Sequence, residues 1–145
     1  MKILVVNGPN LNMLGMREKE HYGTLTLAEI NRLMREEAEK KGVSVVFFQS
    51  NHEGEIIDYV QKEAKEASGI LINPGALTHY GYALRDALVD TGLPIVEVHL
   101  SDLDNREAFR KIDVLDGIVV KKIAGLSEKS YLIGLAELMT AIEKK

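Results

Sequence analysis

The side chains in this sequence that are best suited to acid–base chemistry are a tyrosine, an arginine and several histidines in its loops. Arg17 and Tyr22 lie five residues apart in the polar stretch "LGMREKEHYGT". A tyrosine is protonated at neutral pH, but a guanidinium beside it stabilises the phenolate, which is a good base. The residues alone leave an alternative open, in which Tyr22 packs on the next helix and Arg17 lies in water.

The connection that contains this pair is long. From Asn7 to Leu25 the chain runs for 19 residues before the first expected helix. Connections longer than about 12 to 15 residues are commonly lids or binding loops. With Gly15 and Gly23 as candidate hinges, residues 14–24 are predicted to form a lid over a site.

Polar residues gather where four of the five expected strands end. The stretches are "NGPNLN" (7–12), "QSNHEG" (49–54), "NPGALTH" (73–79) and "EVHLS" (97–101). Glycine, proline and asparagine also make ordinary turns, so one such stretch alone indicates little. Together, at one edge of a sheet, they indicate a concave polar site.

The elements that position these stretches alternate between strands and helices. Strands are expected at 3–6, 43–48, 70–72, 94–98 and 118–123 because these runs are short, apolar and rich in Val and Ile. Five helical segments are expected. The first runs from Thr26 to Gly42, the second stops at Gly69, the third stops at Gly92, the fourth is a short turn at 107–111, and the fifth follows the last strand. The pattern predicts a flavodoxin-like, doubly wound α/β fold of three layers, with a parallel sheet in the order 2-1-3-4-5.

Composition limits the class of protein. The 145 residues are 46% hydrophobic, which suits a single domain with a core. Without cysteine there are no disulfides or thiolates. The net charge of −4, with mixed signs along the chain, argues against nucleic acid as a partner, and no apolar run reaches the roughly 20 residues that span a membrane. We expect a cytoplasmic protein.

Several chemistries that use this fold lack their motifs. The sequence has no G-x-G-x-x-G, no G-x-x-x-x-G-K-[ST] and no G-x-S-x-G. The four polar stretches contain no lysine for a Schiff base, and His52, His79 and His99 are too scattered to indicate a metal site. Acid–base chemistry by Tyr, His and Arg remains.

Four motifs resemble type II 3-dehydroquinate dehydratases. They are "NGPNLNMLGMREKEHYGTLTL", "FFQSNHEGEIIDYV", "INPGALTHYGYALRDAL" and "EVHLSDLDNREAFR", and the similarity continues into "GLSEKSYLIGLAEL". The resemblance implies a shikimate-pathway enzyme that eliminates water from 3-dehydroquinate through an enolate, without a metal, Schiff base or other cofactor. It also implies a homododecamer built from trimers.

The resemblance assigns roles to individual residues. It implies that Tyr22 is the base, that Arg17 keeps it ionised, and that Asn12 helps to hold a water against the enolate oxygen. His99 is implied as the general acid, with Glu97 orienting its ring. The implied substrate-binding residues are Asn73, His79, Leu100, Ser101 and Arg110, together with Asp86, which would reach a neighbouring subunit's site.

The sequence departs from the family pattern in three places. Lys19 stands where proline is common, Gly81 where serine is common, and residues 111–118 differ from the usual segment, which contains histidine and serine. None of these removes an implied catalytic group. The competing hypothesis is a non-enzymatic module of the same fold that binds a small anion at the same edge.

Overall fold

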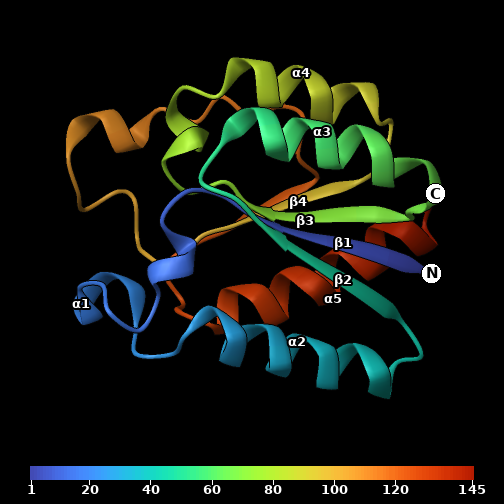
Figure 1. The fold of residues 1–145 in the computed structure, drawn as a ribbon, viewed down its shortest axis with the longest axis horizontal. Helices are drawn as coiled ribbons and strands as arrows, with labels where there is room; N and C mark the ends of the chain where they lie inside the picture. Colours follow the sequence, from blue (N-terminus) through green and yellow to red (C-terminus); the bar gives the residue numbers. More distant parts are fainter.

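The sheet has the predicted parallel topology. The computed structural model describes residues 1–145, and its five strands follow the order β2-β1-β3-β4-β5 (Figure 1). The strands are β1 (Lys2–Asn7), β2 (Ser44–Gln49), β3 (Gly69–Asn73), β4 (Ile95–Val98) and β5 (Lys121–Ile123). Asn7 is in register with both Gln49 and Asn73, so the carboxyl ends of three strands are level. The predicted flavodoxin-like order is confirmed.

Helices cover both faces of the sheet. In Figure 1, α2 (Leu27–Lys40) and α5 (Lys129–Glu143) lie on one side, and α3 (Glu53–Glu63) and α4 (Tyr82–Asp90) on the other. Successive residues of β1 alternate between two cores: Ile3 and Val5 face α2 and α5, while Leu4 and Val6 face α3 and α4. Burial on both faces explains why the strands read as continuous apolar runs.

The signals at the ends of α2 act as predicted. The Thr26 hydroxyl accepts a hydrogen bond from the Glu29 N–H at 3.2 Å, and the Glu29 carboxylate accepts one from the Thr26 N–H at 2.8 Å. This capping box fixes the start of the helix. Gly42, with φ of 68°, follows its end.

The last strand is shorter than predicted. Residues 118–120 were expected to be extended, but only Lys121–Ile123 pair with β4. Gly117 has φ of 85° and closes a turn just before them. Ile118 and Val119 pack instead against the core on the α3 and α4 side. Ala83 in α4 and Ala136 in α5 stand beside buried apolar residues of their helices, but both are exposed.

Short helical turns shape the carboxyl edge. They are η1 (Leu11–Met13), α1 (Lys19–Tyr22), η3 (Gly75–His79) and η4 (Ala108–Lys111), while η2 (Ala64–Glu66) extends α3 elsewhere. The segment at residues 14–24 therefore contains one helical turn, with Gly15 at φ of 93° and Gly23 at φ of 72°. Both α1 and the segment that carries η4 project beyond the ends of the strands (Figure 1). No helix is both long enough and apolar enough to cross a bilayer.

Candidate active site

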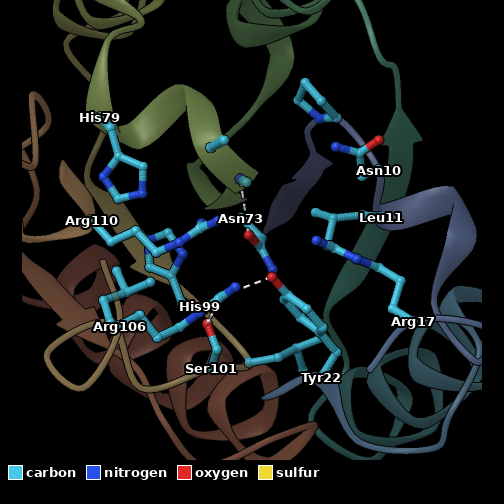
Figure 2. A pocket seen from close by; sticks show the side chains of 15 residues that line it. Asn10, Leu11, Arg17, Tyr22, Asn73, His79, His99, Ser101, Arg106 and Arg110 are labelled. Atoms are coloured by element: carbon cyan, nitrogen blue, oxygen red, sulfur yellow. Dashed lines mark hydrogen bonds between the residues drawn. The ribbon is translucent and has the colours of Figure 1, made fainter. Parts of the chain in front are cut away.

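A cavity of about 100 Å³ lies beyond the carboxyl ends of β1, β3 and β4. This is the edge at which ligands bind in open α/β sheets, where the strand order reverses between β1 and β3. Figure 2 shows its side chains converging from separate loops. Eight of the predicted site residues line it: Arg17, Tyr22, Asn73, His79, His99, Leu100, Ser101 and Arg110.

Three predicted residues lie outside the lining. Asn12 in η1 is exposed, whereas Asn10, two residues earlier, lines the cavity. Asn10 has φ of 70°, and its backbone N–H donates to the Asn51 side chain at 2.9 Å, which fixes the turn. Asp86 is exposed on α4. Glu97 is fully buried directly behind His99.

Two guanidinium groups surround the Tyr22 side chain in different ways. Arg106 Nη1 donates a hydrogen bond to the Tyr22 hydroxyl at 2.7 Å, while the Arg17 guanidinium carbon lies 3.6 Å from the centre of the phenol ring. Figure 2 shows Arg17 and Arg106 on opposite sides of the ring. A hydrogen bond from a cation and a second positive charge both favour negative charge on the phenol oxygen.

The imidazole of His99 is held by a buried carboxylate. His99 Nε2 lies 2.6 Å from Glu97 Oε1, and both side chains are almost fully buried. The Thr78 hydroxyl donates to the same carboxylate oxygen at 2.5 Å. Because Nε2 is engaged by Glu97, Nδ1 is the ring nitrogen left for a ligand.

The second histidine in the cavity, His79, is held by a backbone carbonyl oxygen and not by a carboxylate. Its Nδ1 lies 2.6 Å from the carbonyl oxygen of Ile112, which can only accept, so Nδ1 carries the proton. Burial lowers the pKa of His79, and the charges of His99 and Arg110 lower it further, while the bond to Ile112 raises it. The ring is therefore neutral at neutral pH, with Nε2 free to accept a hydrogen bond.

Asn73 is fixed by a network beneath the cavity. Its Oδ1 accepts from the Gly75 N–H at 3.1 Å, and its Nδ2 donates to the Tyr131 hydroxyl at 2.9 Å. That hydroxyl in turn donates to Asn7 Oδ1 at 2.6 Å. Burial raises the pKa of Tyr131, although the bond to Asn73 opposes this, so the hydroxyl keeps its proton. One Nδ2 hydrogen of Asn73 remains for a ligand.

The cavity as a whole favours an anion. Three arginines and two histidines line it, and no carboxylate does. Neither Leu100 nor Ser101 donates its backbone N–H to a backbone acceptor. Two free N–H groups beside Arg110 suit the two oxygens of a carboxylate.

Residues 1–139 match the family described as dehydroquinase class II. The chain belongs to the class II dehydroquinase family. The 3-dehydroquinate dehydratase of Roseiflexus castenholzii (strain DSM 13941 / HLO8) is 54% identical over 139 residues, which are 96% of this chain and 88% of the relative. That of Carboxydothermus hydrogenoformans (strain ATCC BAA-161 / DSM 6008 / Z-2901) is 51% identical over 145 residues, 100% of this chain and 94% of the relative.

The solved structures agree with this assignment. The crystal structure of type II dehydroquinase from Butyrivibrio crossotus DSM 2876 superposes with a TM-score of 0.92 at 44% identity, covering 95% of this chain and 97% of that one. The class II dehydroquinase fold therefore extends over almost the whole chain.

Two residues of this dehydroquinase site were missed from the sequence. Arg106 stands in "DNREAFR" with nothing to distinguish it from other surface charges, and only the fold brings it to Tyr22. Asn10 differs from Asn12 only by its place in the turn. Its position just after "GP", at the tightest part of the loop, was the available signal.

The hydrogen bonds that join Asn73, Tyr131 and Asn7 should contribute measurably to the stability of the fold. Tyr131→Phe removes one hydroxyl and leaves both Asn73 Nδ2 and Asn7 Oδ1 without their partner in a dry site. We expect the free energy of unfolding, measured by urea titration, to fall by about 1 to 3 kcal/mol.

Tyr59→Phe is the matched control. The Tyr59 hydroxyl is buried without a partner, and its ring stacks on Phe48 with centroids 4.1 Å apart. Removing this hydroxyl keeps the stacking and should change the free energy by less than about 0.5 kcal/mol. Equal losses in both variants would contradict the importance of the Asn73 network.

Proposed function

We propose that this class II dehydroquinase chain eliminates water from 3-dehydroquinate to give 3-dehydroshikimate, as a cytoplasmic enzyme of the shikimate pathway. The observation that carries the proposal is the pairing of two opposite groups in one cavity. Tyr22 faces it beside two guanidinium groups, and His99 faces it with a carboxylate behind its ring. The first arrangement suits a base and the second suits an acid.

Binding comes first in the proposed mechanism. The substrate carboxylate accepts hydrogen bonds from the free backbone N–H groups of Leu100 and Ser101. His79, through Nε2, and Arg110 hold ring hydroxyls, and Asn73, which has one Nδ2 hydrogen left, lines the same space. Arg110 gives up its contact with Glu107, which is exposed, at little cost.

Proton removal is the next step. The Tyr22 phenolate takes a proton from the carbon next to the ketone, and the electron pair of that C–H bond moves onto the ketone oxygen as an enolate. Arg106 and Arg17 place positive charge beside the Tyr22 side chain, which favours the phenolate that this step uses. We assign to Asn10, rather than to Asn12, the amide that holds a water against the enolate oxygen, because Asn10 lines the cavity.

Loss of the hydroxyl completes the reaction. The enolate electrons re-form the ketone and create the ring double bond as the C–O bond breaks, and His99 gives its proton to the departing oxygen, which leaves as water. Glu97 stabilises the imidazolium before this transfer. Tyr22 then releases a proton and His99 takes one up. We further propose that residues 14–24 close over the substrate as a lid that carries Arg17 and Tyr22.

The direct test of the function is a rise in ultraviolet absorbance from the conjugated enone when the protein is mixed with 3-dehydroquinate. The rise should survive a chelator and borohydride, because no step uses a metal or an imine. Tyr22→Phe should lower kcat by a factor of at least about 10² to 10⁴ with little change in ligand binding, since it removes only the base.

Tyr59→Phe again serves as the control, because Tyr59 lies on α3 away from the cavity, and its kcat should equal that of the starting protein. A folded protein that binds 3-dehydroquinate without converting it would favour the binding-module hypothesis. Full turnover by Tyr22→Phe would refute the assignment of the base.

Arg106 yields a separate prediction. In Arg106→Gln the Tyr22 oxygen loses a charge-assisted hydrogen bond worth about 1.5 to 3 kcal/mol, which corresponds to a loss of about 10- to 150-fold in kcat. Arg32→Gln is the control, because Arg32 is exposed on α2 and pairs only with Glu36. If kcat is unchanged in Arg106→Gln and only KM rises, Arg106 binds substrate and does not act on Tyr22.

The oligomer is also a proposal. Helix α4 exposes Tyr82 and Val89 near Asp86, an apolar surface that a neighbouring subunit would cover. We propose a homododecamer built from trimers, in which Asp86 reaches the substrate site of the next subunit.

Sedimentation should give a particle of twelve chains. Asp86→Ala should lower kcat/KM about tenfold, the effect of one lost hydrogen bond to the site. Asp90→Ala, at the exposed end of the same helix, should leave kcat/KM unchanged. A fully active monomer would contradict this assignment.

A further inference from the structure

A chain of buried polar groups continues behind His99, beyond the carboxylate that holds it. Glu97 Oε1 accepts from the Thr78 hydroxyl at 2.5 Å, and the same hydroxyl lies 3.0 Å from Asp113 Oδ1. Asp113 Oδ2 lies 2.9 Å from Lys122 Nζ. His99 is thus connected through Glu97 and Thr78 to an ion pair between Asp113 and Lys122 of β5, both of which lie outside the cavity.

The Thr78 hydroxyl can serve only one of its two carboxylates. It has one proton, and both Glu97 and Asp113 present an oxygen to it. The two carboxylates differ in their remaining hydrogen bonds. Asp113 Oδ1 also accepts from the Leu115 N–H at 2.8 Å, whereas Glu97 Oε2 is buried without a hydrogen-bond partner. The charge of Glu97 therefore depends on its neighbours more strongly than that of Asp113.

Both members of the ion pair are charged at neutral pH. Burial opposes the charge of Asp113, but its interactions with the Glu97 side chain, Lys122 and the Leu115 N–H hold the pKa of Asp113 below its ordinary value. Burial likewise opposes the charge of Lys122, yet Asp113 and, more weakly, Glu97 raise the pKa of Lys122. The field of Lys122 thus reaches Glu97 as well as Asp113.

Counting charges shows what this arrangement favours. Lys122 balances Asp113, which leaves Glu97 with only the His99 imidazolium to balance it. The cluster is therefore neutral when His99 carries a proton. Its carboxylates and imidazole are buried while Lys122 is exposed at its edge, and an unbalanced charge among the buried groups is costly. The ion pair at the far end sets how firmly that proton is held.

We propose that Asp113 and Lys122 are positioning residues that set the pH range over which His99 keeps the proton it delivers. This inference rests on the proposed role of His99 as the general acid. Asp113 stands in the segment that also fixes the cavity wall, since Ile112 accepts from His79 and the Val114 N–H donates to the Thr78 carbonyl at 2.7 Å.

The two residues should act in opposite directions. Without the negative charge of Asp113, Lys122 is an unbalanced cation near Glu97 and His99 loses its proton at lower pH. Without Lys122, Asp113 is an unbalanced anion and His99 keeps its proton to higher pH. The other charged or titratable groups that face this cluster and the cavity side of His99 are Glu97, His79, Arg17, Arg106, Arg110, Asp116 and Tyr22.

The test uses the full chain and the variants Asp113→Asn, Lys122→Gln and their combination. Asparagine keeps the Oδ1 acceptor for Thr78 and Leu115, so the change is mainly one of charge. In the pH profile of kcat, the alkaline limb should move down by about half to one pH unit in Asp113→Asn and up by a similar amount in Lys122→Gln. The double variant should return close to the starting profile.

Lys121→Gln is the matched control. Lys121 precedes Lys122 on the same strand but pairs with Glu137 at 2.8 Å on the surface, so the same change of charge should leave the limb in place. A merely structural role for the pair would reduce stability in both single variants without moving the limb in opposite directions. If Asp113→Asn fails to fold, Lys122→Gln still decides, because its limb must move up.

A readout independent of turnover separates this inference from the proposed function. The chain has four histidines, so the His99 ring can be followed by NMR titration of ¹⁵N-histidine-labelled protein. Opposite shifts of its titration in the two single variants would support the inference even if the protein had no dehydratase activity. Unchanged titration in both would overturn it, even in a fully active enzyme.

Discussion

The site depends on one constraint: polar groups that are buried where parallel strands end must find partners there. The aligned ends of β1 and β3 place Asn7 and Asn73 side by side in a region that both helical layers exclude from water. Tyr131 from α5 supplies one hydroxyl to both amides. Helix α5 therefore fixes the ends of β1 and β3. The turn at Gly75, which begins the cavity wall, is held by the Asn73 amide, because the Gly75 N–H donates to Asn73 Oδ1.

From this edge the cavity solves two opposite electrostatic problems. In the proposed mechanism Tyr22 is the base, and positive charge beside it comes from two long side chains, with Arg17 stacked on the ring and Arg106 bonded to the oxygen. The proposed acid, His99, has negative charge beside it from the fully buried carboxylate of Glu97 on β4. Arginines line the opening and the Glu97 carboxylate lies beneath it, so the proposed base and the proposed acid do not share one counterion.

The sequence predicted most of the frame and part of the site. Strands that are apolar on both faces, alternating with helices, predicted the parallel sheet and its order, because these follow from topology. The capping box predicted the start of α2, because it is a local pattern. Arg106 could not be found this way, because it reaches Tyr22 across 84 positions of the chain. The choice between Asn10 and Asn12 depended on side-chain direction in a tight turn, and the length of β5 depended on the Gly117 turn; neither has a periodic signal.

The cluster behind His99 is hard to explain as a source of stability. Burying two carboxylates and pairing one with a lysine gains little over an apolar core of similar volume, and Glu97 Oε2 has no partner at all. Such a cost is tolerated where the charge has a use, and unpartnered polar atoms in native proteins concentrate at such places. Here the unpaired oxygen belongs to the carboxylate that touches His99. An apolar replacement of Asp113 and Lys122 would remove one negative and one positive charge together, so it would leave the balance between Glu97 and His99 nearly unchanged, whereas removal of either charge alone would shift it.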